Sequence, residues 1–152
     1  MKRWSESIEI EAPIEQVWQY FDQSLDQMKK VMPNIVEHRR IHSSGEAVGN
    51  VYRQAYSLGE RNEDYEVTIV EYNDGETEKK LTYSYTLAGV YDIQATYLLE
   101  KIGKTKTKFT YLSSNRPRRW YLRLLILFSN DQAVTNFVRR VKRVAEEEYQ
   151  SA

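Results

Sequence analysis

The sequence predicts an α+β domain in which an antiparallel sheet is closed by a long C-terminal helix. Two observations carry this prediction. All six glycines lie in the middle of the chain, and from Gly59 onward they recur every 14 to 16 residues, which is the spacing of successive hairpins. The last third instead carries apolar residues at helical spacing, without any glycine.

The first elements are a strand, two short helices and a second strand. Apolar residues alternate up to Ile10, and Pro13 then sets the backbone for a first helical turn. A helix from Ile14 to Phe21 follows, and a second one from about Leu25 to Val31 ends before Pro33. Residues 35–41 form the second strand.

Five strand-like runs rich in Tyr, Thr, Val and Ile lie between the glycines. The segments Leu81–Leu87 and Tyr65–Ile69 alternate apolar with polar residues, which is typical of a sheet with one covered face. Short loops between neighbouring runs predict an antiparallel meander. The five runs are Val51–Leu58, Tyr65–Tyr72, Leu81–Leu87, Tyr91–Glu100 and Lys106–Ser113.

The C-terminal helix is predicted from about Asn130 to Tyr149. Ser129 and Gln132 resemble a capping box at its start, and a broad apolar stripe that includes Phe137 and Val141 follows. Residues 118–128 are interpreted as a separate, shorter segment, because one helix through both regions would be too long for this domain.

Length and composition favour one soluble, cytoplasmic domain over residues 1–152. A chain of 152 residues is about one domain, and the absence of cysteine fits a reducing compartment. The N-terminus lacks the apolar run of a signal peptide, and the longest apolar stretch, 120–128, is too short for a membrane span. Basic and acidic residues balance at 22 each, so we expect no nucleic-acid partner.

Several stretches resemble the START-like superfamily, also called SRPBCC, which includes polyketide cyclases and Bet v 1-like proteins. The most specific is Ala12-Pro13-Ile14-Glu15-Gln16-Val17-Trp18, which resembles the end of the family's first strand and the start of its first helix. Val48-Gly49-Asn50-Val51-Tyr52 and Leu81-Thr82-Tyr83 resemble later strand motifs. The similarity in element order covers nearly the whole chain.

This resemblance implies a helix-grip fold, in which a curved seven-stranded antiparallel sheet wraps around the C-terminal helix. It also implies a cavity between sheet and helix. Members of the superfamily bind sterols, lipids, quinones, polyketides or plant hormones, and some are cyclases or hydratases. Fold alone therefore does not decide the function.

The tyrosines are the first candidates for contacts with a ligand in such a cavity. A phenol joins an apolar body to one polar tip, so it suits a mainly hydrophobic ligand, although tyrosine is also simply a good strand residue. Both interpretations stay open. The candidate cavity residues are Tyr52, Tyr56, Tyr65, Tyr83, Tyr85, Tyr97, Tyr111, Arg53, Phe137 and Val141.

Other chemistries have weaker support. His38 and His42 on one strand would lie about 13 Å apart, too far to share a metal ion, so we expect no metal site. Neither a nucleophile elbow nor a glycine-rich phosphate loop occurs, and we expect no cofactor. Acid–base catalysis stays open through Arg53, Glu63 or Glu71, if one of them points into the cavity.

Residues 116–128 combine arginines with Trp120 and a run of leucines. They either close one end of the core or form an exposed patch for a homodimer or a membrane surface.

Three hypotheses follow. The first is a binding or carrier domain for a hydrophobic small molecule such as a lipid, quinone or polyketide-like compound. The second is a cyclase or dehydratase with an acid–base group in the cavity. The third is an interaction protein that uses 116–128. The sequence leaves catalysis open and favours the non-catalytic binding domain.

Overall fold

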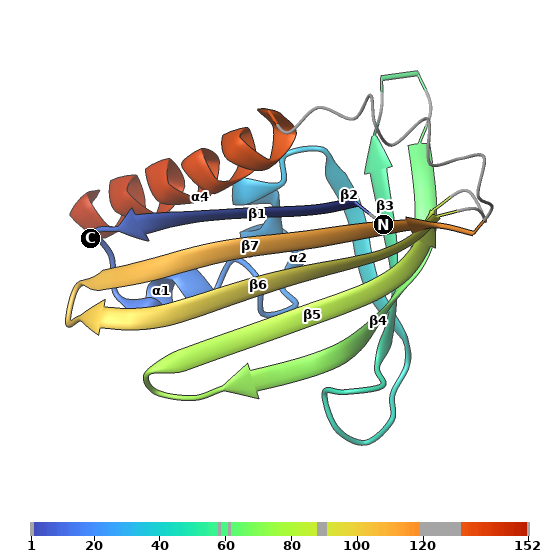
Figure 1. The fold of residues 1–152 in the computed structure, drawn as a ribbon, viewed down its shortest axis with the longest axis horizontal. Coiled ribbons are helices and arrows are strands. Elements are labelled where there is room, and N and C mark those ends of the chain that lie inside the picture. Colours follow the sequence, from blue (N-terminus) through green and yellow to red (C-terminus); the bar gives the residue numbers. More distant parts are fainter. Residues whose placement is uncertain (1, 58, 61, 88–90, 119–131, 152) are drawn as a thin grey trace.

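The computed structural model describes residues 2–57, 59–60, 62–87, 91–118 and 132–151. Within them, seven strands and three helices follow one another in the predicted order (Figure 1). The elements are β1 (Lys2–Ile10), α1 (Ile14–Trp18), α2 (Leu25–Val31), β2 (Ile35–His42), β3 (Val51–Ser57), β4 (Asn62–Asp74), β5 (Glu78–Leu87), β6 (Tyr91–Gly103), β7 (Lys106–Pro117) and α4 (Gln132–Ser151).

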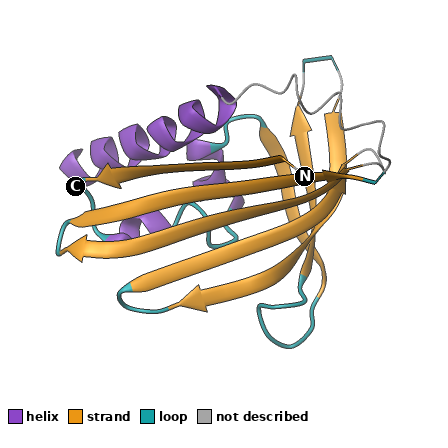
Figure 2. Ribbon diagram, viewed as in Figure 1, coloured by secondary structure: helices purple, strands orange, loops and turns teal. Residues whose placement is uncertain are grey.

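The strands form one antiparallel sheet with the order β1-β7-β6-β5-β4-β3-β2. Strands β2 to β7 therefore form the predicted meander, and β1 joins it by pairing with β7. The sheet is strongly curved, and all helices lie on its concave side, with α4 running beside β1 (Figure 2). This arrangement is the helix-grip order that the resemblance implied.

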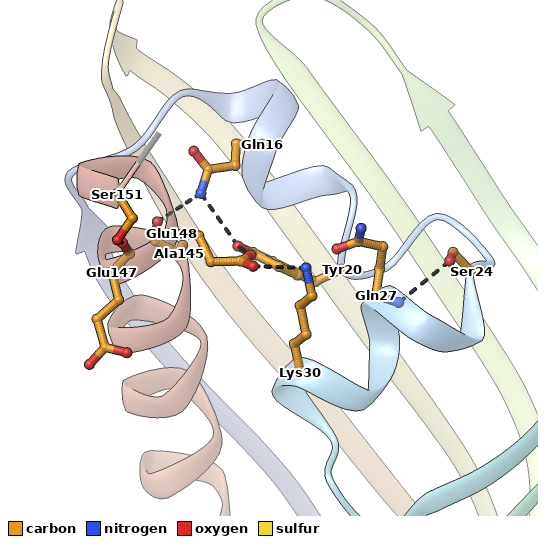
Figure 3. A network of polar contacts seen from close by, with 9 residues as sticks. All are labelled: Gln16, Tyr20, Ser24, Gln27, Lys30, Ala145, Glu147, Glu148 and Ser151. Atoms are coloured by element: carbon orange, nitrogen blue, oxygen red, sulfur yellow. Dashed lines mark hydrogen bonds and ion pairs between the residues drawn. The ribbon is translucent and has the colours of Figure 1, made fainter.

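The short helices begin where local chemistry favours a start. Pro13 precedes α1 with an extended backbone, φ −63° and ψ 148°. Ser24 caps α2 by accepting a hydrogen bond from the backbone N–H of Gln27 (Figure 3). Met28 and Val31 of α2 face the core, as predicted. Helix α1 ends at Trp18, earlier than the periodicity up to Phe21 predicts, because the next residues form turns.

Two glycines show why the turns need this residue. Gly49 has φ +92°, a conformation that side chains with a Cβ rarely adopt, and its N–H donates to the carbonyl of Ile69. Gly75 closes the β4–β5 hairpin, where an added Cβ would lie 2.9 Å from the backbone oxygen of Glu78. The hairpin therefore has no room for a side chain at this position.

Helix α4 is tied to α1 and α2 by polar contacts at its C-terminal end (Figure 3). The Tyr20 hydroxyl donates to Glu148 Oε1 at 2.5 Å, and Lys30 Nζ donates to Glu148 Oε2 at 2.7 Å. Gln16 Nε2 donates to the Ala145 carbonyl at 2.7 Å. The hydrogen bond from Lys30 lowers the pKa of Glu148 most, and the one from Tyr20 lowers it further. The carboxylate therefore stays charged and holds both partners.

A buried lysine ties α1 to the β4–β5 hairpin. The Lys79 side chain is only 3% exposed, and it pairs with Asp74 and with Glu15, the latter at 3.2 Å. Its Nζ also lies 5.8 Å from the centre of the Trp18 ring. Burial lowers the pKa of Lys79, but the hydrogen bonds to both carboxylates outweigh this effect and raise it. The ammonium group is therefore charged in the folded protein.

Each predicted strand is present, and most extend beyond the predicted ends. Strand β4 gains three residues before Tyr65, and β7 continues past Ser113 to Pro117. Helix α4 runs to Ser151 rather than Tyr149. The predicted cap at Ser129 lies outside the described residues, as does most of the 116–128 segment.

Candidate functional site

A cavity of about 210 Å³ lies between the concave face of the sheet and the first turns of α4. Five neighbouring strands contribute to its wall, and α4 and the residue after α2 complete it. The lining residues are Met32, Gln54, Tyr56, Tyr65, Val67, Tyr83, Tyr85, Ala95, Tyr97, Tyr111, Ala133, Val134 and Phe137. Ala133 is exposed, so the cavity meets the surface at the start of α4.

Alternation along the strands places these side chains on one face. On β5, Tyr83 and Tyr85 point into the cavity, whereas Ser84 between them lies on the outer face of the sheet. The strand register then brings tyrosines of neighbouring strands together, since Tyr97 of β6 is paired with Tyr111 of β7. Their rings stack with centroids 5.6 Å apart.

A second stack lies on β3, β4 and β5. The Tyr65 ring lies 4.8 Å from that of Tyr85 and 5.8 Å from that of Tyr56, with nearly parallel planes. Three phenols from β3, β4 and β5 therefore make a continuous aromatic surface. Such a surface favours flat, apolar molecules and offers a hydroxyl group at the edge of each ring.

Phe137 brings α4 onto this aromatic wall. Its ring packs edge-on against Tyr111 at 5.1 Å and against Phe109 at 6.1 Å. These contacts fix where the helix crosses the sheet. The helix thus closes the cavity on the side away from the strands.

The cavity has no formal charge among its described lining residues, which are apolar apart from one glutamine and six tyrosines. Burial, and then the neighbouring phenols, raise the pKa of Tyr85 and Tyr97 above the ordinary value of 10.0. Burial likewise raises the pKa of Tyr111. The phenols therefore remain neutral hydrogen-bond donors at physiological pH.

A half-buried histidine lies beside the cavity wall, on the same face of the sheet as its strand partner Gln54. His38 on β2 stacks on Tyr52 with ring centroids 4.4 Å apart. Its Nδ1 lies 2.9 Å from Gln54 Nε2, and its Nε2 lies 2.7 Å from Gln23 Oε1. The Tyr83 hydroxyl donates to the same Gln23 oxygen at 2.9 Å.

These contacts form one chain of hydrogen bonds that starts and ends at cavity residues. Gln54 and Tyr83 both line the cavity, and His38 and Gln23, which are not lining residues, connect them. Burial lowers the pKa of His38 to about 4, so its ring is neutral at pH 7. A neutral ring agrees with the contacts, because one nitrogen accepts from Gln54 and the other donates to Gln23.

The structure brings most of the predicted cavity residues together. Of these candidates, Tyr56, Tyr65, Tyr83, Tyr85, Tyr97, Tyr111 and Phe137 line the cavity. Tyr52 is not a lining residue and stacks on His38, and Val141 is buried in the core with Phe21 and the first strand.

Arg53 lies away from the cavity. It pairs with Asp64, and its Nε lies 3.9 Å from Glu37. The physical reason is strand alternation, since Gln54 next to it takes the inner face of β3.

The predicted acid–base carboxylates also fall outside the cavity wall. Glu71 lies 2.8 Å from Lys80 Nζ and is within 3.5 Å of the Thr82 hydroxyl. Glu63 precedes Tyr65 on the same face of β4 but is not a lining residue. No three potential metal ligands gather anywhere in the described part of the chain.

Sequence reasoning missed the polar chain beside the wall. It placed His38 on a strand face and expected no metal there, and it did not consider Gln23 or Gln54. Two features mark them in hindsight. Gln54 is a polar residue at an inward position between Tyr52 and Tyr56, and Gln23 has φ +69°, which is uncommon for a residue other than glycine.

The 116–128 segment, to which the core and the interface interpretations both refer, lies mostly outside the described residues. Within the described part, Arg118 Nε donates to Asp92 Oδ1 at 3.0 Å. No helix among the described residues has both the length and the apolar character that crossing a membrane requires.

Comparison with known proteins places this architecture in a family. The family model for polyketide cyclase / dehydrase and lipid transport matches residues 1–146. No curated protein matches the chain by sequence.

Solved structures confirm the helix-grip fold. Ginseng major latex-like protein 151 from Panax ginseng superposes with a TM-score of 0.69 at 16% identity, covering 97% of either chain. The human StarD13 lipid transfer and protein localization domain gives 0.67 at 16% identity, covering 95% of this chain and 77% of that chain. Norcoclaurine synthase from Thalictrum flavum, in complex with dopamine and hydroxybenzaldehyde, gives 0.65 at 15%, covering 96% and 87%.

Proposed function

The chain belongs to the polyketide cyclase / dehydrase and lipid transport family, and we propose that it is a binding or carrier domain for a hydrophobic small molecule. The ligand occupies the cavity between the sheet and α4. The observation that carries this proposal is the aromatic wall of the cavity, which combines two stacks of tyrosines with Phe137. Apolar walls with a few polar tips are typical of small-molecule sites.

The electrostatics of the cavity favour a neutral ligand. A carboxylate or ammonium group would lose its hydration without gaining an opposite charge from the described lining residues, and this costs several kcal/mol. Neutral phenols can instead donate to carbonyl, ether or hydroxyl oxygens. A quinone, a polyketide-like compound or another uncharged aromatic molecule fits this chemistry better than a fatty acid.

The related structures support binding as the common property. One is a lipid transfer domain, and another holds the aromatic molecules dopamine and hydroxybenzaldehyde. Because their identity to this chain is low, they support small-molecule binding in general and neither the charge nor the identity of the ligand.

The experiment has two parts. Native mass spectrometry of protein purified from cells should find a neutral adduct, and a thermal-shift panel of quinones and neutral and acidic lipids should raise Tm with neutral members. Ala95→Phe fills the cavity, since Ala95 is 4% exposed and lines its wall. This variant should lose the shift.

Gln94→Phe is the matched control. It adds the same ring to the next residue, which lies exposed on the outer face of the sheet. The control should bind as the unmodified protein does. If Ala95→Phe binds equally well, the cavity is not the binding site.

Catalysis of the cyclase or dehydratase type is the second candidate, favoured by the family and by the crowded hydroxyl groups of the cavity. It has less support than binding, because the described lining residues include no carboxylate, histidine, lysine or arginine. Phenols whose pKa is raised are also poor proton donors at neutral pH. Recovery of a bound polyketide-like compound in cyclised form would favour the enzyme.

A further inference from the structure

The polar chain beside the cavity wall has a consequence for the ligand. Gln54 is 5% exposed and is one of the residues that line the cavity. An amide can present either an oxygen, which accepts, or an NH2 group, which donates, and the two ends have almost the same shape. If the protein holds the NH2 group, the oxygen is left for the ligand, and if it holds the oxygen, the NH2 group is left.

His38 decides which end is held. Its Nε2 lies 2.7 Å from Gln23 Oε1, an oxygen that also accepts from the Tyr83 hydroxyl at 2.9 Å. With a carbonyl oxygen at this distance, Nε2 carries the ring proton and Nδ1 is left without one. Nδ1 therefore accepts from Gln54 Nε2, at 2.9 Å.

We infer that His38 is a positioning residue that orients the Gln54 amide, so that its Oε1 faces the cavity as a fixed acceptor and selects ligands that bring a hydroxyl or N–H group to this point. This inference rests on the proposed binding function and adds a specificity to it. The surrounding phenols can donate to a ligand's oxygens, whereas Gln54 supplies an acceptor that cannot turn into a donor. The cavity thus distinguishes a free hydroxyl from its methyl ether.

The ring stack on Tyr52 supports this role. It holds the imidazole plane almost parallel to the phenol, at an angle of 8°. The ring therefore cannot rotate freely to exchange its two nitrogens. The stack on Tyr52 sets the position of the imidazole ring, and the contact with Gln23 sets its tautomer.

The test uses two neutral probes, 2-naphthol and 2-methoxynaphthalene, which differ only in the capped hydroxyl group. Isothermal titration should show that the unmodified protein binds the naphthol roughly 2- to 12-fold more tightly, the ratio that one net hydrogen bond supplies. Gln54→Met keeps the length of the side chain without the amide, and this ratio should fall to about 1.

His38→Phe keeps a ring on Tyr52 but removes both nitrogens, so the Gln54 amide is free to turn. We expect the ratio to fall towards 1 while the affinity for the methyl ether is retained. A merely structural role would instead weaken both probes equally. His42→Phe, the same substitution at an exposed position of the same strand, is the matched control and should keep the preference.

The outcomes separate the two proposals. If both probes bind equally, or the methyl ether binds more tightly, the inference that Gln54 selects a hydroxyl group is wrong, while the binding function stands. If the preference survives in Gln54→Met, another group supplies the acceptor and the inference is also wrong. If neither probe nor any neutral member of the thermal-shift panel binds, the binding function itself fails.

Discussion

Acid should destabilise this protein through His38. The imidazole is packed between Tyr52 and the side chains of Gln23, Gln54 and Tyr83. Protonation adds a hydrogen to Nδ1, which faces the NH2 group of Gln54, and it places a positive charge in a site with neutral neighbours. Both effects oppose the charged form, and burial lowers the pKa of His38 to about 4.

The sign and size of the effect follow from this pKa. In the unfolded chain His38 titrates near 6.5, so between pH 6.5 and about 4 the unfolded state binds a proton that the folded state does not. The contribution of this group is therefore fully present above pH 6.5 and is lost as the pH falls towards 4. At about 1.4 kcal/mol per pH unit the full loss is about 3.5 kcal/mol, and since the ring keeps some exposure we expect about 1 to 3 kcal/mol.

Urea unfolding at several values between pH 7.5 and pH 4 measures this loss. Carboxylates also titrate in this range, so the informative quantity is the difference in unfolding free energy between the unmodified protein and His38→Phe. The unfolding free energy of the unmodified protein minus that of His38→Phe should fall by about 1 to 3 kcal/mol on acidification. The same difference measured against His42→Phe is the control.

Proton NMR gives a direct check, because the chain has only two histidines and His42→Phe assigns the signal of His38. A midpoint near 6.5 for His38, or a stability difference that does not change with pH, would refute the reasoning.

Three further predictions concern contacts of the fold outside the cavity. Tyr20→Phe removes the hydroxyl that donates to Glu148, so urea unfolding should show a loss of about 1.5 to 3 kcal/mol, and an unchanged stability would mean that α4 does not depend on this contact. Lys79→Met keeps the packing under Trp18, and because both carboxylate partners are substantially exposed, the unfolding free energy should change by less than about 1 kcal/mol; a larger loss would contradict this. Gly75→Ala should lower Tm by several degrees, a loss of about 1 kcal/mol or more, since the new Cβ meets backbone; an unchanged Tm would show that the hairpin adjusts freely.

Local patterns in the sequence were sufficient for the elements and their order. The alternation around Tyr65 and Tyr83 marks strands because side chains of a strand point to opposite faces in turn. Glycine spacing marked the hairpins, and Pro13 marked the start of α1. These properties depend on a few consecutive residues, so they can be read without knowledge of the rest of the chain.

The inward face of each strand was harder to assign, because a shift by one residue exchanges all the side chains between the two faces. Most of the predicted tyrosines do line the cavity, since their strands alternate clearly. Strand β3 alternates less clearly, and there Arg53 was chosen where Gln54 lines the cavity. Both neighbours are polar, so composition alone did not distinguish them.

What the sequence determined by itself is therefore the sheet, its hairpins and the C-terminal helix. Only the tertiary structure decided which residues join the polar chain beside the cavity wall. Gln23 and Tyr83 are 60 residues apart, and His38 and Gln54 are 16 apart, yet one chain of hydrogen bonds joins all of them. Contacts of this kind arise from the curvature and register of the whole sheet, which no local pattern contains.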